Sequence, residues 1–162
     1  MDSYALLIAA TLNAGTVLAI ASLGLLINEK AGIVNLGAEG MMLCAAIAGF
    51  AAVVHTGSDT MGFLAGIAAG AFMAAIFGGL VIWLNTNQYA TGLALSLFGA
   101  GFSAFAGIAY VQAQIPERPN FAVPYLSDIP LAGPALFRQH PLVYLTVVFA
   151  LVLIWFFYRT RS

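Results

Sequence analysis

The segment NEKAGIVNLGAEGMM, residues 28–42, is a polar, glycine-containing break between two strongly apolar stretches. It carries three of the eleven charged residues of the chain, Glu29, Lys30 and Glu39. Apolar stretches as long as these two are typical of helices that cross a membrane, and a polar break between them separates one helix from the next. The position of this break therefore sets the division of the chain into helices.

The composition of the 162-residue chain indicates an integral membrane protein. Hydrophobic residues make up 62% of the chain, charged residues make up 7%, and the mean hydropathy is +1.00, which water-soluble domains do not reach. A formal net charge of −1 without a basic run argues against nucleic-acid binding. The lone cysteine, Cys44, excludes a disulfide within the chain. No residues stand at metal-ligand spacing, and we expect neither a metal nor a cofactor.

The apolar segments predict an all-α, polytopic membrane helix bundle of about five transmembrane helices, forming a single domain over residues 1–162. Residues 113–141 contain all six prolines and predict an extramembrane loop or re-entrant cap. The second span has only 15 clearly apolar residues, fewer than the ~20 that a crossing needs, so we expect a short or broken helix that recruits residues from about Ile33. The predicted spans are residues 4–27, 40–54, 61–84, 91–112 and 142–158.

The positions of lysine and arginine predict the orientation, because positive residues near span ends tend to stay in the cytoplasm. Arg159 and Arg161 follow the fifth span directly. If this end is cytoplasmic, alternate crossing places the break with Lys30 and the polar residues 85–89 on the same cytoplasmic side. The proline-rich segment then lies outside.

Small residues predict close helix packing in the third span. They recur every four residues along one face, where small side chains allow helices to approach closely in lipid. The glycines that we expect to pack are Gly62, Gly66, Gly70 and Gly78.

Four polar residues of the two breaks are candidates for a solute path. Glu39 would cost about 2.5–3.5 kcal/mol within a spanning segment unless it is paired or faces water, and glycines near it allow the backbone to leave helical geometry. Asn35 offers an amide in the same break, and Asn87 and Gln88 offer two more in the second. The alternatives are structural: Glu39 as a helix-start residue near the positive end of the dipole, and residues 85–89 as an exposed loop.

Nothing in the sequence indicates an enzyme. It contains no HExxH, GxSxG or GxxxxGK[ST] motif and no embedded carboxylate pair for proton relay. ATP-driven activity would therefore need a separate subunit.

Four segments resemble permease subunits of bacterial ABC importers in the branched-chain amino acid and simple-sugar permease family, closest to its nucleoside and simple-sugar group. They are NEKAGIVNLGAEGMML at 28–43, NQYATGLALSLFGAGFSAFAG at 87–107, SDIPLAGPALFRQHPLVYL at 127–145, and the ending FYRTRS.

The resemblance implies a permease component in a bacterial inner membrane, for nucleosides or simple sugars. Its partners would be an ATP-binding ABC subunit, a second permease subunit and an extracytoplasmic lipoprotein binding protein. Family permeases are about twice as long, so the chain resembles their N-terminal half. Two alternatives stay open: a truncated, non-transporting half-permease that acts as a structural or interaction partner, and an ATP-independent channel or secondary transporter.

Overall fold

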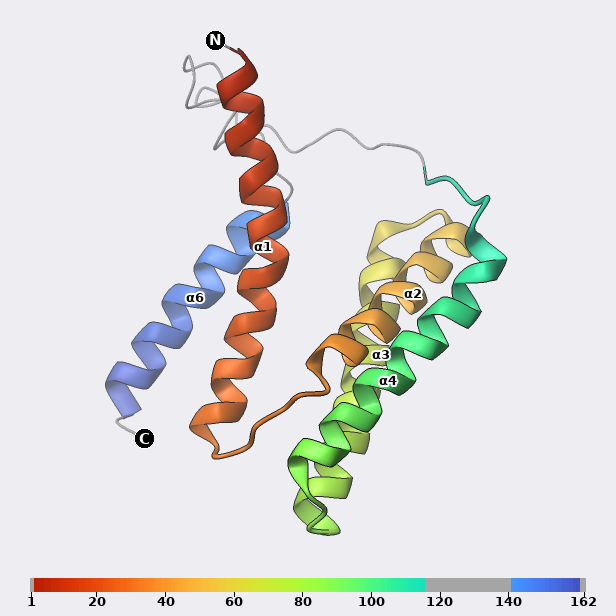
Figure 1. The fold of residues 1–162 in the computed structure, drawn as a ribbon. Helices are drawn as coiled ribbons and strands as arrows, with labels where there is room; N and C mark the ends of the chain where they lie inside the picture. The colour runs from red at the N-terminus through yellow and green to blue at the C-terminus, as the bar shows by residue number, and fades with distance from the viewer. Residues whose placement is uncertain (1, 116–140, 161–162) are drawn as a thin grey trace. The chain divides into compact units, whose positions relative to one another are not determined.

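The computed structural model describes residues 2–115 and 141–160, and their regular structure is helical throughout (Figure 1). Most of the predicted proline-rich loop, residues 113–141, lies outside the described residues. The elements are α1 (Asp2–Lys30), α2 (Ala38–Thr56), α3 (Asp59–Gly78), the π-helical turn η1 (Gly79–Trp83), α4 (Gln88–Gly107), the 3-10 turn η2 (Ile108–Tyr110) and α6 (Pro141–Thr160).

The helices confirm the all-α, polytopic prediction. Four of them are long and apolar enough to cross a membrane, and α6 contributes a shorter apolar helix, Val143–Arg159. The second span is the shortest of the four, at 19 residues, and a non-helical segment of residues 31–37 precedes it, as expected for a short helix after a break. The fourth helix begins at Gln88, three residues earlier than predicted.

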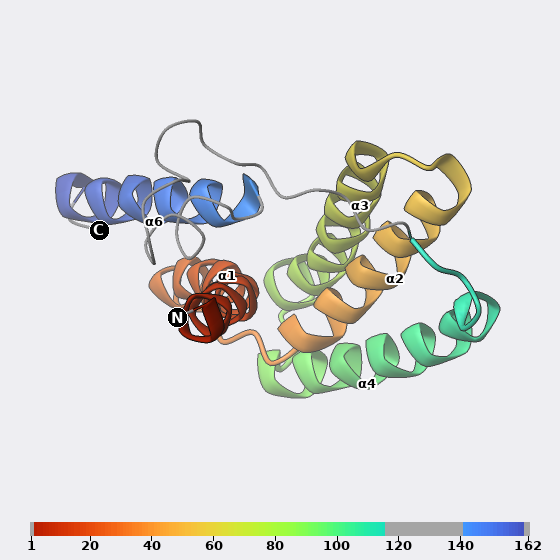
Figure 2. The ribbon, with the colours of Figure 1, turned by 90° about the horizontal axis from the view of Figure 1, so that it is seen from above.

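The described residues divide into two compact units, and residues 31–115 form the first of them. Within it, α2 lies between α3 and α4 (Figure 2). A cluster of buried side chains joins the three helices near the start of α2, and Ile33 from the non-helical segment packs against it. The cluster consists of Met41, Cys44, Met73, Phe77 and Leu95.

Backbone contact between α2 and α4 is unusually close because both helices present glycine at the crossing. A Cβ atom on Gly40 would lie 2.6 Å from the Cα atom of Ser96, and one on Gly99 would collide with the backbone of Gly40. Real Cβ atoms do not approach that closely, so only glycine fits at either place. In lipid, where packing drives helix association, such contacts hold a helix pair together.

The predicted packing glycines of α3 divide into two groups. Gly62, Gly66 and Gly70 lie against α2, where Cβ atoms would be 3.1 Å from the Gly49 carbonyl oxygen, 3.3 Å from the Ala45 oxygen and 3.7 Å from the Ala45 Cβ atom. Gly78 instead has Ile82 of the following turn as its neighbour, at 3.9 Å. The helix pair α2–α3 thus repeats the small-residue contact of α2–α4 along most of its length.

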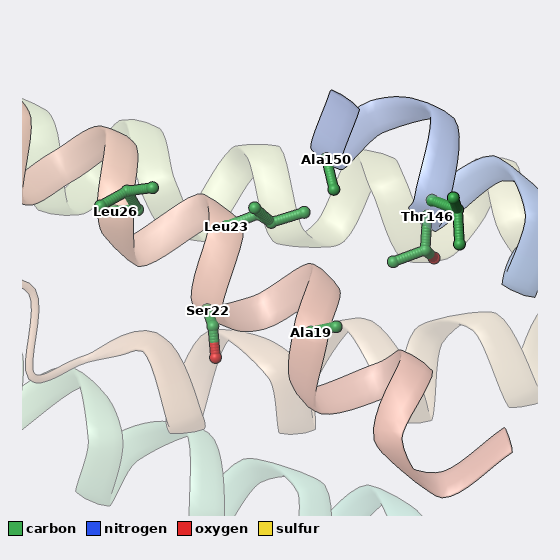
Figure 3. A pocket seen from close by; sticks show the side chains of 7 residues that line it. Ala19, Ser22, Leu23, Leu26, Thr146 and Ala150 are labelled. Atoms are coloured by element: carbon green, nitrogen blue, oxygen red, sulfur yellow. The ribbon is translucent and has the colours of Figure 1, made fainter. Parts of the chain in front are cut away.

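The second unit contains α1 and α6, which lie side by side with their C-terminal ends together. The Lys30 ammonium nitrogen lies 5.8 Å from the centre of the Phe157 ring, a cation–π contact at this shared end. An apolar groove between the helices is lined by side chains that include Leu23 and Leu26 from α1 and Thr146 and Ala150 from α6 (Figure 3). Within this unit α1 and α6 run in the same direction.

Replacement of Gly99 by alanine tests the contact between α2 and α4. The added methyl group would force the helices apart, and we expect a loss of about 1–3 kcal/mol in unfolding free energy, the usual cost of overpacking. Denaturant unfolding in detergent measures it. Gly101→Ala is the matched control, because nothing lies within 4 Å of a Cβ atom there. Equal stability of the two variants would contradict the close approach.

Candidate functional site

The two polar breaks of the sequence meet at one end of the three-helix unit. The backbone N–H of Val34, in the first break, donates to Oε1 of Gln88 at 3.0 Å, across 54 residues of sequence. We call this region the polar junction and define it as residues 31–39 together with residues 85–88. The sequence offered candidate residues in each break separately, and this hydrogen bond places the two breaks in contact.

Local contacts stabilise the non-helical backbone of residues 31–37. Gly32 has a φ of +80°, a left-handed conformation that glycine adopts without strain. Directly after Val34, Asn35 accepts from the Gly37 N–H at 2.9 Å through Oδ1, an Asx turn, and its amide nitrogen lies 3.7 Å from Sδ of Met41. The candidate residue Asn35 thus stabilises the turn from which α2 starts.

The second break follows the π-helical turn and is also held by side chains. Thr86 donates to the Leu80 carbonyl oxygen from its backbone N–H at 3.1 Å and from Oγ1 at 2.9 Å. Its Oγ1 also lies 2.9 Å from Oγ1 of Thr91, in the first turn of α4. Asn85 has a φ of 49°, a left-handed conformation that asparagine tolerates better than most residues. These residues join the end of η1 to the start of α4.

Asn87 is the N-cap of α4. Its Oδ1 accepts from the backbone N–H groups of Tyr89 at 2.9 Å and Ala90 at 3.2 Å, two donors that have no partner within the helix. An asparagine before an apolar helical run is a recognised helix-start signal, and it accounts for the early beginning of α4. The side-chain oxygen of this candidate residue is therefore committed to the helix.

Glu39 lies in the first turn of α2 and is exposed on the surface of this unit. Gly37 precedes the helix without a side-chain cap, so the positive end of the helix dipole and the Glu39 carboxylate lie within one turn. This is the helix-start position that the sequence offered as an alternative. Of the four candidate residues, Glu39 and Asn87 are exposed, and Glu39 is the charged one.

Gly92 and Thr86 complete the junction. Gly92 of α4 lies against the backbone of the first break, where a Cβ atom would be 2.9 Å from the nitrogens of both Leu36 and Gly37. Thr86 and the amide of Val34 have the roles described above. The helix-start signal at Asn87 and the small residue Gly92 within an apolar span point to parts of this arrangement, whereas the remaining contacts join residues far apart in sequence.

Residues 7–162 match the family of permease components of branched-chain amino acid transport systems. The chain belongs to this permease family. Together with the apolar helices, this makes it a multi-pass membrane protein. No solved structure matches the chain.

Among curated relatives of this permease-family chain, the candidate glucose ABC transporter permease protein TsgC13 of Haloferax volcanii is 43% identical over 99% of the chain and 50% of its own length. The guanosine ABC transporter permease protein NupQ of Bacillus subtilis is 28% identical over 91% of the chain and 49% of its own length. The nucleoside ABC transporter permease protein NupC of Lactococcus lactis is 28% identical over 99% of the chain and 54% of its own length. The chain therefore spans about half the length of these relatives.

Replacement of Asn87 by alanine tests the cap. We expect a loss of about 1 kcal/mol in unfolding free energy, because two N–H groups lose their acceptor. Asn87→Asp keeps an acceptor oxygen and should retain most of the stability, since a negative charge at a helix N-terminus is favourable. Chemical denaturation of the purified variants in detergent measures both. An alanine variant as stable as the parent would rule out the capping role.

Proposed function

We propose that this chain is a transmembrane permease component of an ATP-driven ABC importer for nucleosides or simple sugars. The observation that carries the proposal is the family match over residues 7–162. It is supported by three relatives named as ABC transporter permeases, two for guanosine or nucleosides and one, as a candidate, for glucose. Nucleosides and simple sugars share hydroxyl groups that uncharged polar side chains can bind.

The polar junction is the proposed part of the solute path, with Asn35, Glu39, Asn87 and Gln88 as its polar residues. Non-helical backbone at membrane depth is tolerated only where it is buried in protein or lines a water-filled cavity. At the junction two non-helical segments are in contact, and Glu39 is exposed beside them. An acidic side chain in this setting is a functional-site candidate, since lipid exposure of its charge would be costly.

The proposed assembly contains this chain, a second permease subunit, two ATP-binding ABC subunits and an extracytoplasmic lipoprotein binding protein, in a bacterial inner membrane. ATP hydrolysis belongs to the ABC subunits, and this chain has no catalytic role. Residues 113–141 are proposed to lie outside the membrane, on the side where the binding protein docks.

Orientation can be tested by cysteine labelling in the Cys44→Ala background. Glu29 and Gln114 are both exposed and lie on opposite sides of the membrane in the proposed topology. An impermeant maleimide added to intact spheroplasts should label Gln114→Cys, whereas Glu29→Cys should react only after permeabilisation. The reverse pattern would invert the topology.

The proposed function is tested by purification of the tagged chain from its native membrane, followed by ATP-dependent uptake of radiolabelled guanosine and glucose by the reconstituted complex. Recovery of an ABC subunit, a second permease and a lipoprotein, with uptake that stops when the ABC subunit is inactivated, supports the importer. Uptake by the chain alone favours a channel or secondary transporter. Recovery of the chain alone, without uptake, favours a non-transporting role.

Glu39→Gln should lower uptake at least tenfold in the assembled complex if Glu39 faces the path, because the negative charge available to polar groups of the solute is lost. Glu29→Gln is the matched control: it is also exposed but lies in the last turn of α1, outside the polar junction. Uptake rates per assembled complex measure the effect. Equal rates for the two variants would remove Glu39 from the path.

A further inference from the structure

We propose that Gln88 is a positioning residue for transport: its side-chain oxygen holds the first break against α4 and thereby places Glu39, without contact between Gln88 and the solute. The inference rests on the proposed importer function. It gives Gln88 and Glu39 different roles in the same junction: Gln88 positions the backbone, and Glu39 faces the solute path.

The position of Gln88 favours this role. It is the first residue of α4, directly after the capping Asn87, and is only partly exposed. Its Oε1 already accepts from the Val34 N–H at 3.0 Å. This bond to the protein backbone takes one of the two acceptor sites of the side-chain oxygen and fixes the orientation of the amide toward the first break.

Val34 needs such a partner because it stands outside any helix. Residues 33–35 belong to no helix or turn, so no ladder of helical carbonyls accepts the Val34 N–H. A buried or lipid-facing N–H without an acceptor carries a desolvation penalty. The Gln88 oxygen, supplied from 54 residues away, removes this penalty at the centre of the break.

Short steps connect Val34 to Glu39. Asn35 binds the Gly37 N–H at 2.9 Å, and the Met41 N–H donates to the Gly37 carbonyl at 3.0 Å as the first turn of α2. Gly37 is also in close contact with α4, where a Cβ atom would lie 3.1 Å from the Gly92 oxygen. These bonds restrain the backbone conformation of residues 34–41. A shift of Val34 therefore moves the first turn of α2 and with it Glu39.

Two variants of Gln88 distinguish positioning from solute contact. Gln88→Glu keeps an acceptor oxygen for the Val34 N–H but loses the amide donor, and Gln88→Ala loses both. Gln112→Ala is the matched control, an exposed glutamine after η2 at the other end of α4. Hydrogen exchange over residues 31–37 is measured on the purified chain in lipid nanodiscs. Uptake of radiolabelled guanosine and glucose is measured on the complete complex, against the concentration of binding protein.

Positioning predicts about fivefold faster exchange over residues 31–37 in Gln88→Ala, as expected for loss of one hydrogen bond, and parent-like exchange in Gln88→Glu and Gln112→Ala. It also predicts a maximal uptake rate per assembled complex at least threefold lower in Gln88→Ala, restored in Gln88→Glu. The half-saturating concentration of binding protein should not change, because that protein docks on the opposite side. A loss of folding would instead lower the amount of complex.

Two results would overturn the inference. One is parent-like exchange in Gln88→Ala, which would show that the hydrogen bond does not hold the break. The other is uptake lost equally in both Gln88 variants while Gln88→Glu keeps its protection, which would show that the amide touches the solute. If the parent complex transports neither probe, the importer proposal fails for these solutes, and the positioning role in transport falls with it, whereas the exchange data still report on the hydrogen bond.

Discussion

Every backbone N–H and C=O group that leaves water needs a partner inside the protein, and this requirement governs the described helices and the breaks between them. The helices meet it internally. The two breaks, residues 31–37 and 85–88, lack such internal partners, and the amide oxygens of Asn35, Asn87 and Gln88 accept backbone N–H groups there. Thr86 donates twice to the Leu80 carbonyl oxygen. Asn35, Asn87 and Gln88, which the sequence offered as candidate solute ligands, therefore bind backbone N–H groups of the protein.

The close approach of α2 and α4 makes this arrangement possible. Gly40 and Gly99 let the two backbones touch, and Gly92 lets the first break lie directly on α4. Only at such a separation can the side chain of Gln88 reach the Val34 N–H. The buried cluster around Met41 and Leu95 lies at the same end, so packing and hydrogen bonding reinforce each other at the polar junction.

The division of roles within the junction bears on the proposed transport function. A path residue must be free to change partners during a cycle, whereas a positioning residue must keep its partner. Asn35 and Asn87 use their oxygens to start helices, and Gln88 uses its oxygen between breaks. Glu39 and Asn87 are both exposed, but the Asn87 oxygen already caps α4. The π-helical turn before Asn85 adds a local irregularity of the kind that often occurs near functional sites.

The sequence by itself determined that the chain is an all-helical membrane protein and where most of its helices lie, because the bilayer fixes the length and apolarity of a spanning helix. It also located both breaks, since charge and glycine interrupt the apolar runs. It placed the start of α4 three residues late, because the capping role of Asn87 was read as loop character. Only the tertiary structure decided that Gln88 binds Val34 and that Gly99 meets Gly40, whereas Gly78 faces its own next turn. These pairings depend on which helix faces come together across 50 or more residues, and hydrophobic periodicity along one helix carries no information about its partner.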